Sequence, residues 1–187
     1  ATVDIDVLDK PNLTLAFRDT SICVPDNVQL NAATTGTGTF SWSPLSNITN
    51  PTTATPTVSP TSTTRYYVNL DENGCFARDS VEVRVVGFVT LNAMADTTIC
   101  QTDGVQLTAA TDGLQFLWSP SQTLSDPTIL NPVATPTQTI TTYQIEARIG
   151  SCRATDNVTI TTVPYPIANA GAPQTICYNT STQLNGS

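Results

Sequence analysis

Five cysteines are the residues of this 187-residue chain whose type and spacing point most clearly to chemistry. Cys23, Cys100 and Cys177 recur every 77 residues, and Cys75 and Cys152 are also 77 residues apart. Cysteines can stay free as small buried hydrophobes, whereas regularly placed cysteines in an oxidising compartment form disulfides. The spacing favours disulfides, and it therefore predicts an extracellular or cell-surface protein.

Composition excludes several other kinds of chemistry. The chain has no histidine, so it cannot build a Ser–His or Cys–His catalytic pair, and we expect no enzyme activity. Its 7 basic and 15 acidic residues give a net charge of −8. That balance excludes a nucleic-acid binder, which neutralises phosphates with lysine and arginine. We also expect no membrane span, because no apolar run approaches about 18 residues.

Acidic side chains in predicted loops are the remaining candidates for a site. A calcium ion needs about six to eight oxygen ligands from several such groups. The alternative is turn formation, in which Asp side chains bond the nearby backbone. Asp112 and Asp126 correspond to Thr35 and Asn50 one repeat earlier, so no full carboxylate cluster recurs. Turn formation is therefore favoured, and the sequence predicts no cofactor, with Ca²⁺ as the minor alternative. The residues considered are Asp26, Asp71, Glu72, Asp103, Asp112 and Asp126.

The segments that must position these residues recur along the chain. Residues 27–33 match residues 104–110, and residues 42–44 match residues 118–120. Many matches at one offset predict tandem repeats with a period of about 77 residues. The predicted organisation is the last strand of a preceding repeat (1–9), a first repeat (10–86), a second repeat (87–163) and the start of an incomplete third repeat (164–187).

Each repeat has the pattern of six or seven short strands, so the predicted fold class is all-β. Threonine and valine are frequent, and both favour strands. In the first repeat, residues 13–17 and 20–23 are expected to form a split first strand, and residues 66–70 and 81–85 alternate between apolar and polar side chains. The proline-rich stretch 50–60 is predicted to be a loop or an edge strand, because proline cannot donate a ladder hydrogen bond.

Four aromatic residues refine this fold prediction. Trp42 and Trp118 are expected in the core on the third strand of each repeat, and Tyr66 and Tyr143 open the penultimate strand. This arrangement is typical of an immunoglobulin-like β-sandwich. Sugar stacking is the less favoured interpretation of the tryptophans, since their strand positions point inward.

Several motifs carry a resemblance to a known group of proteins. They include Gln174–Cys177, Trp118–Pro120, Asn131–Pro136 and Thr141–Tyr143. With these motifs the chain resembles the tandem PKD-like, immunoglobulin-like repeats of large secreted proteins of Bacteroidota. The resemblance covers essentially the whole chain, and its motifs are specific for the repeat type.

The resemblance implies structural stalk repeats of a long extracellular adhesin or surface filament, such as those used in gliding motility and exported by type IX secretion. The stalk would extend a distal binding region from the cell. Its partners would be neighbouring repeats and, in a filament or bundle, other copies of the protein. Two alternatives are that the repeats themselves bind extracellular polysaccharide or surfaces, and that they are accessory modules of a secreted enzyme.

Two disulfide patterns remain open. Pairing within repeats, Cys23–Cys75 and Cys100–Cys152, encloses the same 52-residue interval twice. In such a sandwich, however, Cys23 and Cys75 lie at opposite ends of the repeat, about 30 Å apart, and a disulfide needs Cα atoms within roughly 7 Å. Pairing between repeats, Cys23–Cys152, is therefore favoured, and Cys75 would then pair backward and Cys100 forward, both outside this sequence. In the pattern within repeats, Cys177 is left over because its mate would lie past Ser187.

Two further pairs of residues are singled out by position. Phe88 and Tyr165, 77 residues apart, lie at the predicted joints, where each packs either between repeats or onto its own repeat. Ser80 and Thr97 lie in Asp-Ser-Val and Asp-Thr-Thr triplets that resemble the short O-glycosylation motif of Bacteroidota, which makes them candidate glycan sites.

Overall fold

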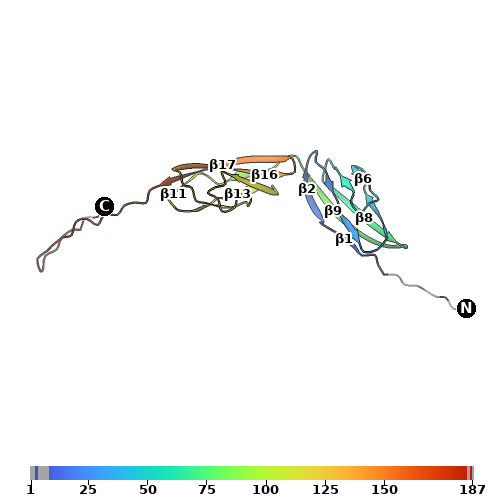
Figure 1. Ribbon diagram of the computed structural model, residues 1–187, viewed down its shortest axis with the longest axis horizontal. Coiled ribbons are helices and arrows are strands. Elements are labelled where there is room, and N and C mark those ends of the chain that lie inside the picture. The colour runs from blue at the N-terminus through green and yellow to red at the C-terminus, as the bar shows by residue number, and fades with distance from the viewer. Residues whose placement is uncertain (1–2, 4–8, 185, 187) are drawn as a thin grey trace.

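The computed structural model describes residues 3, 9–184 and 186, and these residues form strands but no helix. The strands fall into two groups, β1–β9 and β10–β17, and pair only within their group. We call them the first and second unit. The units lie end to end in an elongated, bent arrangement with the chain termini at opposite ends (Figure 1). The predicted repeat limits remain predictions, and the strand predicted at 1–9 falls almost entirely outside the described residues.

The first unit is a β-sandwich. One layer is a four-stranded sheet in the order β2-β9-β8-β5, and the facing strands form the sheets β3-β7-β6 and β1-β4. The strands are β1 (Leu13–Leu15), β2 (Asp19–Cys23), β3 (Val28–Gln29), β4 (Ala32–Thr34), β5 (Thr39–Ser43), β6 (Ile48–Thr49), β7 (Thr57–Val58), β8 (Thr64–Glu72) and β9 (Cys75–Val86).

The second unit repeats the four-stranded order as β11-β17-β16-β14, while its facing sheets, β12-β15 and β10-β13, have two strands each. Its strands are β10 (Leu91–Ala93), β11 (Thr97–Cys100), β12 (Val105–Gln106), β13 (Ala109–Thr111), β14 (Gln115–Ser119), β15 (Val133–Ala134), β16 (Ile140–Ile149) and β17 (Cys152–Val163). In both units the first pair of the four-stranded sheet is parallel and the other pairs are antiparallel. The all-β, immunoglobulin-like fold predicted from the sequence is confirmed.

Alternating side chains explain why each unit closes as a sandwich. On β8, Tyr66, Val68 and Leu70 are at most 1% exposed, whereas Tyr67 between them is 55% exposed. Val81 and Val83 of β9 are equally buried. Successive side chains of a strand point to opposite faces, so this alternation buries one face of the sheet and leaves the other in water.

The tryptophans lie in the two cores. Trp42 and Trp118 are 2% and 1% exposed, and Tyr66 and Tyr143 are fully buried. Each indole N–H donates to a backbone carbonyl of its own unit, Trp42 Nε1 to Thr53 at 2.9 Å and Trp118 Nε1 to Leu130 at 3.2 Å. A buried indole keeps its apolar contacts at little cost when its single donor is satisfied in this way.

The proline-rich stretch corrects one sequence prediction. Most of residues 50–60 lie in turns and loops, as predicted, but Thr57 and Val58 form β7, which pairs with β3 on one side and β6 on the other and is therefore a central strand and not an edge. Pro56 and Pro60 flank this two-residue strand, and the Pro56 carbonyl accepts a hydrogen bond from Leu30 N at 2.9 Å. Proline lacks only the donor, so its carbonyl can still extend the ladder.

Two further points concern the ends and the membrane. Residues 164–184, which belong to the predicted third repeat, carry no strand. Across the described residues there is no helix of the length and apolar character needed to cross a bilayer.

Candidate functional site: the joint between the units

A disulfide joins the two units. Cys23 is the last residue of β2 and Cys152 is the first residue of β17, and their Cα atoms are 5.5 Å apart across a sequence separation of 129 residues. Cys23 lies beside Val86, the last residue of β9, so it lies where the chain leaves the first unit. Cys152 opposes Ile149 at the β16–β17 hairpin, which is the end of the second unit that faces the first (Figure 1).

Of the two disulfide patterns left open by the sequence, the structure forms the one between units. Pairing within the first unit is excluded by strand direction, because Cys75 begins the 12-residue strand β9 whose other end lies beside Cys23. That strand spans about 36 Å at ~3.3 Å per residue, far beyond the reach of a disulfide. The same reasoning separates Cys100, which pairs with Val163 at the end of β17, from Cys152 at its beginning. Cys75, Cys100 and Cys177 are free thiols.

An apolar cluster surrounds the disulfide. Only residues 87–90 separate β9 from β10, so the two units are held close together. Within this linker Val89 is buried, at 6% exposed. Burying such side chains stabilises the contact between the units by removing apolar area from water. The buried members of the cluster are Cys23, Val89, Ala147, Ile149 and Cys152, with Val86, Leu91, Phe116 and Ala154 packed against them.

One side-chain hydrogen bond also crosses the joint. Oδ2 of Asp26, in the turn after β2, accepts the backbone N–H of Ser151 at 2.8 Å. The preceding residue, Gly150, has a φ of +54°, and a Cβ at this position would lie 2.0 Å from the same oxygen. Glycine suits both the left-handed backbone and the close approach of the carboxylate, because a side chain here would force the Asp26 carboxylate to shift.

The aromatic residues predicted at the joints do not pack there. Phe88 is 71% exposed, and its neighbour Val89 fills the contact instead, at 6% exposed. Tyr165 is 55% exposed, and its hydroxyl donates to the Asp103 carboxylate of the second unit. This hydrogen bond raises the pKa of Tyr165. Tyr165 therefore contacts the end of the second unit, the unit that precedes it along the chain.

Four of the six acidic residues considered for calcium bond to groups of their own unit. Asp71 accepts from Gly74 N at 3.0 Å, and Glu72 accepts from Thr37 N at 2.9 Å. Hydrogen bonds from Thr90 lower the pKa of Asp112, and those from Thr128 lower the pKa of Asp126. Asp103 accepts from Tyr165, as described above, and the sixth residue, Asp26, bonds across the joint. Among the described residues no three His, Cys, Asp or Glu side chains gather in a metal-binding group.

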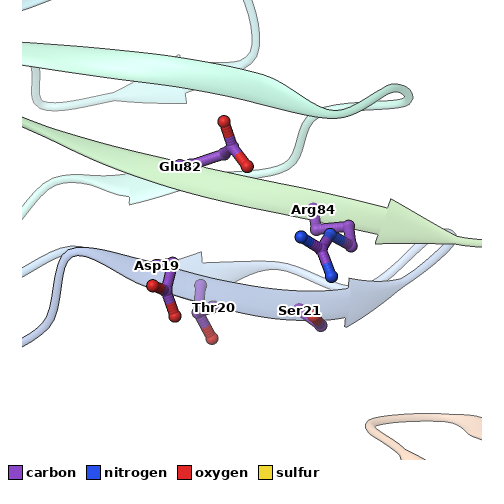
Figure 2. A pocket seen from close by; sticks show the side chains of 5 residues that line it. All are labelled: Asp19, Thr20, Ser21, Glu82 and Arg84. Carbon is purple, nitrogen blue, oxygen red and sulfur yellow. The ribbon is translucent and has the colours of Figure 1, made fainter. Parts of the chain in front are cut away.

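A small surface hollow of about 180 Å³ lies on the outer face of β2 and β9. Figure 2 shows Glu82 and Arg84 from β9 beside Asp19, Thr20 and Ser21 from β2. The Glu82 carboxylate is paired with Arg65 at 2.7 Å. The hollow therefore presents mixed and partly paired charges on an open sheet surface.

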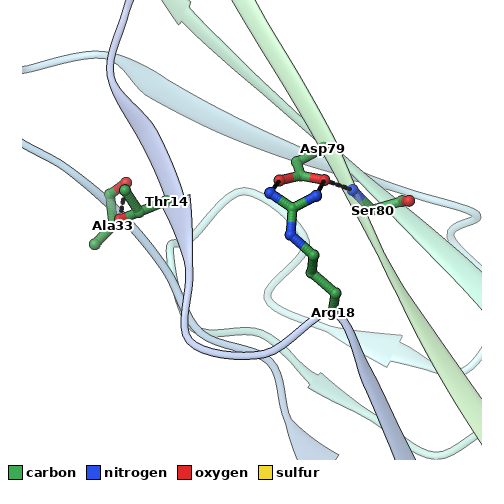
Figure 3. A network of polar contacts seen from close by, with 5 residues as sticks. All are labelled: Thr14, Arg18, Ala33, Asp79 and Ser80. Carbon is green, nitrogen blue, oxygen red and sulfur yellow. Dashed lines mark hydrogen bonds and ion pairs between the residues drawn. The ribbon is translucent and has the colours of Figure 1, made fainter.

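The two candidate glycan positions lie on strands. Ser80 is half-buried on β9, and its N–H donates to Asp79, whose carboxylate also binds Arg18 (Figure 3). Thr97 is half-buried at the start of β11 and pairs with Ile160. Glycosylation at Ser80 and Thr97 remains a prediction.

Sequence reasoning missed four residues of the joint, namely Asp26 as a contact between units, Val89, Ile149 and Gly150. A signal was available in the hairpins, because the first unit has Glu72-Asn73-Gly74-Cys75 where the second has Ile149-Gly150-Ser151-Cys152. A glycine and an apolar residue that replace a polar residue and a charged one beside a cysteine indicate a contact.

No family model and no curated protein matches this chain. Among solved structures it is similar to a chimeric titin Z1Z2 carrying a decorin peptide, with a TM-score of 0.36, 12% identity, and coverage of 84% of this chain and 100% of that one. It is also similar to extracellular domains 3–5 of Drosophila OTK (TM-score 0.41, 9% identity, covering 81% and 62%). A third similarity is to Dpr2 Ig1–Ig2 in complex with DIP-Theta Ig1–Ig3 (TM-score 0.44, 12% identity, covering 87% and 70%). The immunoglobulin-like fold of the chain rests on its own sheet order, β2-β9-β8-β5 repeated as β11-β17-β16-β14.

Proposed function

We propose that this chain is part of an extracellular stalk, in which immunoglobulin-like units joined end to end by disulfides hold a distal region away from the cell. The observation that carries the proposal is the Cys23–Cys152 disulfide between units. Such a bond suits a compartment outside the cytosol. The resemblance to surface repeats of Bacteroidota agrees with this role, and the adhesin, its gliding function and its type IX export belong to the proposal.

The disulfide gives the stalk a specific mechanical property. Tension between the chain ends passes from Cys23 to Cys152 through the sulfur–sulfur bond and bypasses the chain between them, a sequence separation of 129 residues. Those residues include every strand from β3 to β16. At ~3.5 Å per extended residue, about 450 Å of chain is protected from extension. A stalk of such units keeps its length under load even if a core opens.

Single-molecule pulling on the whole chain tests this property. Under oxidising conditions we expect extension only from the segments outside residues 23–152, and addition of a reductant releases about 450 Å more. The matched control is Cys100→Ser, which removes a free thiol and is expected to behave like the unaltered chain. Release of the full length without reductant would contradict the proposal.

A second candidate function, polysaccharide binding, is supported by the outer face of the first unit. A hollow of about 470 Å³ there is lined by Tyr67, Asn69 and Arg78, with Ser41 and Ser43 beside them. Tyr67 is 55% exposed, and an exposed aromatic ring beside amide, guanidinium and hydroxyl groups can stack on and hydrogen-bond a sugar. Binding of soluble polysaccharides to the whole chain should fall about tenfold in Tyr67→Ala and stay unchanged in Phe76→Ala, a similarly exposed aromatic residue on β9.

A further inference from the structure

We propose that the joint selects which units can be stapled together. In this proposal an aspartate at the position of Asp26 requires a partner hairpin with glycine at the position of Gly150 and an apolar residue at the position of Ile149. The inference rests on the proposed stapled stalk and deepens it, because it names the class of partner that fits each free half of a joint.

Each joint has two halves: a strand end that carries one cysteine and the following turn, and a hairpin that carries the other cysteine. The second unit has a strand-side half that is not in a joint, at Cys100, and it resembles the one at Cys23. Cys100 lies beside Val163 at the end of its sheet, as Cys23 lies beside Val86. A turn follows each cysteine, with Asp26 N donating to Cys23 O at 2.6 Å and Asp103 N donating to Cys100 O at 3.2 Å. Asp103 therefore holds the place relative to Cys100 that Asp26 holds relative to Cys23.

Asp103 already accepts a hydrogen bond from Tyr165, but it can still accept a second one from the hairpin of another unit. Tyr165 donates to Oδ1 of Asp103. In the joint that is formed, Ser151 donates to Oδ2 of Asp26, and the corresponding oxygen of Asp103 is not the one that binds Tyr165. The same carboxylate can accept both donors, since it offers about four lone-pair sites. The free strand-side half is therefore complete in its polar groups.

The first unit has a hairpin-side half that is not in a joint, at Cys75, but its side chains differ from those of the hairpin at Cys152. Cys75 opposes Glu72 as Cys152 opposes Ile149. Asn73 has a φ of 54°, the same value as Gly150. The backbone of the two hairpins is therefore alike at this residue, while a glycine and an isoleucine are replaced by an asparagine and a glutamate.

These replacements oppose docking of an aspartate-bearing strand end. A Cβ at the glycine position would force the aspartate carboxylate to shift, as the 2.0 Å approach at Gly150 shows, and this shift would weaken the hydrogen bond between the units. Ile149 is 3% exposed within the joint, whereas Glu72 at the equivalent position carries a carboxylate that accepts the Thr37 N–H, and docking would bury this charge near the carboxylate of the aspartate. Burial of an unpaired charge beside a like charge is strongly unfavourable.

The partner of each free half follows from this chemistry. The Cys100 end fits an immunoglobulin-like unit whose final hairpin has an apolar residue, glycine and any residue before cysteine. The Cys75 end fits a unit with a neutral or cationic residue in place of the aspartate. The chain contains such a neutral turn, since Thr180 N donates to Cys177 O at 3.1 Å. A second copy of this chain joined through Cys100 and Cys75 is not a match, because this joint would bring Asp103 against Glu72 and Asn73.

A gain of linkage in the whole chain tests the proposal. All variants carry Cys177→Ser to remove the exposed third thiol. After incubation in a glutathione redox buffer, peptide mapping measures disulfides between Cys75 of one copy and Cys100 of another. The double variant Glu72→Ile/Asn73→Gly, which copies the second hairpin, is expected to raise this linkage at least tenfold over the chain with its own hairpin.

The matched control is Glu72→Ile alone, which adds the same apolar surface but keeps the Asn73 Cβ, and we expect it to leave the linkage near the starting level. An unchanged linkage in the double variant, with Cys23–Cys152 still formed, would overturn the proposal. An equal rise in the single variant would overturn the requirement for glycine. Absence of Cys23–Cys152 in the unaltered chain would instead refute the stalk itself.

The reverse substitution covers the case in which the double variant fails to fold. Gly150→Asn should lower the equilibrium constant for forming Cys23–Cys152 against glutathione about tenfold, and adding Asp26→Gly should restore much of it by removing the displaced carboxylate. Ser151→Asn is the neighbouring control and should have little effect, because only the backbone N–H of Ser151 is used. Equal behaviour of Gly150→Asn and Ser151→Asn would contradict the proposal.

Discussion

The two units share the order of their four-stranded sheet but fix their split first strand, β1 and β2 or β10 and β11, with different hydrogen bonds. In the first unit the exposed side chain of Arg18 reaches across to Asp79 of β9 and binds both carboxylate oxygens, at 3.0 and 2.8 Å (Figure 3). In the second unit Asp156 of β17 accepts the backbone N–H of Ala93 at 2.8 Å without any arginine. The same place in the fold thus uses an aspartate in both units and changes only the donor.

This comparison teaches which features the fold demands and which it leaves free. Both units need a buried tryptophan and tyrosine, since these residues fill the core. The donor to the β9 or β17 aspartate can vary, because any N–H that reaches it satisfies the same oxygen. The hairpins vary most, since they meet different neighbours.

The largest expected effect concerns the separate cores. Trp118→Ala should lower the free energy of unfolding of the second unit by about 3–5 kcal/mol, because it empties a large buried site. Trp42 then remains as the single tryptophan, and its fluorescence during guanidinium unfolding reports the first unit. We expect that transition to shift by less than about 1 kcal/mol. A shift as large as that of the second unit would show that the units form one cooperative core, and Trp42→Ala provides the mirror experiment.

Loss of the disulfide should have the next largest effect, and it should act on both units at once. Cys152→Ser should lower the free energy of unfolding by about 2–4 kcal/mol, since the open chain gains conformational freedom. Cys75→Ser is the matched control, because Cys75 occupies the equivalent hairpin position as a free thiol, and it should change stability by less than about 0.5 kcal/mol. Comparable losses in the two variants would mean that the observed pairing contributes little.

Loss of the hydrogen bonds to Asp79 and Asp156 should lower the free energy of unfolding by less, and by different amounts in the two units. Asp156→Ala should cost the second unit about 1–2 kcal/mol, because it leaves the Ala93 N–H without its acceptor. Arg18→Ala should cost the first unit at most about 1 kcal/mol, since the Arg18 side chain is 73% exposed and water screens the ion pair. Chemical denaturation of both variants measures the difference, and a larger loss in Arg18→Ala would reverse the comparison.

The smallest expected effect is a sensitivity of the second unit to acid. Hydrogen bonds from Thr90 lower the pKa of Asp112, and those from Ala93 and Asn157 lower the pKa of Asp156, both from 3.8. A carboxyl group with a lowered folded pKa contributes stability above its unfolded pKa, and that stability is lost as the pH falls through the folded pKa. The second unit should therefore lose stability as the pH falls below about 4.

The variant Trp42→Phe leaves Trp118 as the single tryptophan, so its fluorescence reports unfolding of the second unit. Chemical denaturation of this variant at pH 5 and pH 3 then measures the loss of stability. The variant Asp112→Asn/Asp156→Asn should show a smaller difference between the two pH values, because its amides do not titrate. An undiminished pH dependence in that variant would assign the acid sensitivity to other groups.

Much of the fold could be predicted because its signals are local. Alternation of residues 66–70 and 81–85 indicated a buried face for each strand, and the tryptophans marked the cores. The central position of β7 is not predicted, because the missing donors of the prolines favour an edge strand or a loop, although the proline carbonyl still accepts. Residue types in a strand thus predict which face is buried, but not always which neighbours the strand will have.

The joint could be predicted only in part. Strand direction separated Cys23 from Cys75 and favoured Cys152, and the structure agrees. Val89 is buried and Phe88 is exposed because of the path that the four-residue linker takes, and a repeating sequence pattern does not predict that path. The Asp26–Ser151 hydrogen bond joins residues 125 apart and exists only once the two units have docked.

Peptide mapping of the native protein without reductant tests the central claim most directly. Cleavage after arginine places each of the five cysteines on a separate fragment, with Cys23 on 19–65, Cys75 on 66–78 and Cys152 on 149–153. A disulfide between units predicts a linked pair of fragments 19–65 and 149–153. A linked pair of 19–65 and 66–78 would contradict the joint and the stalk built on it.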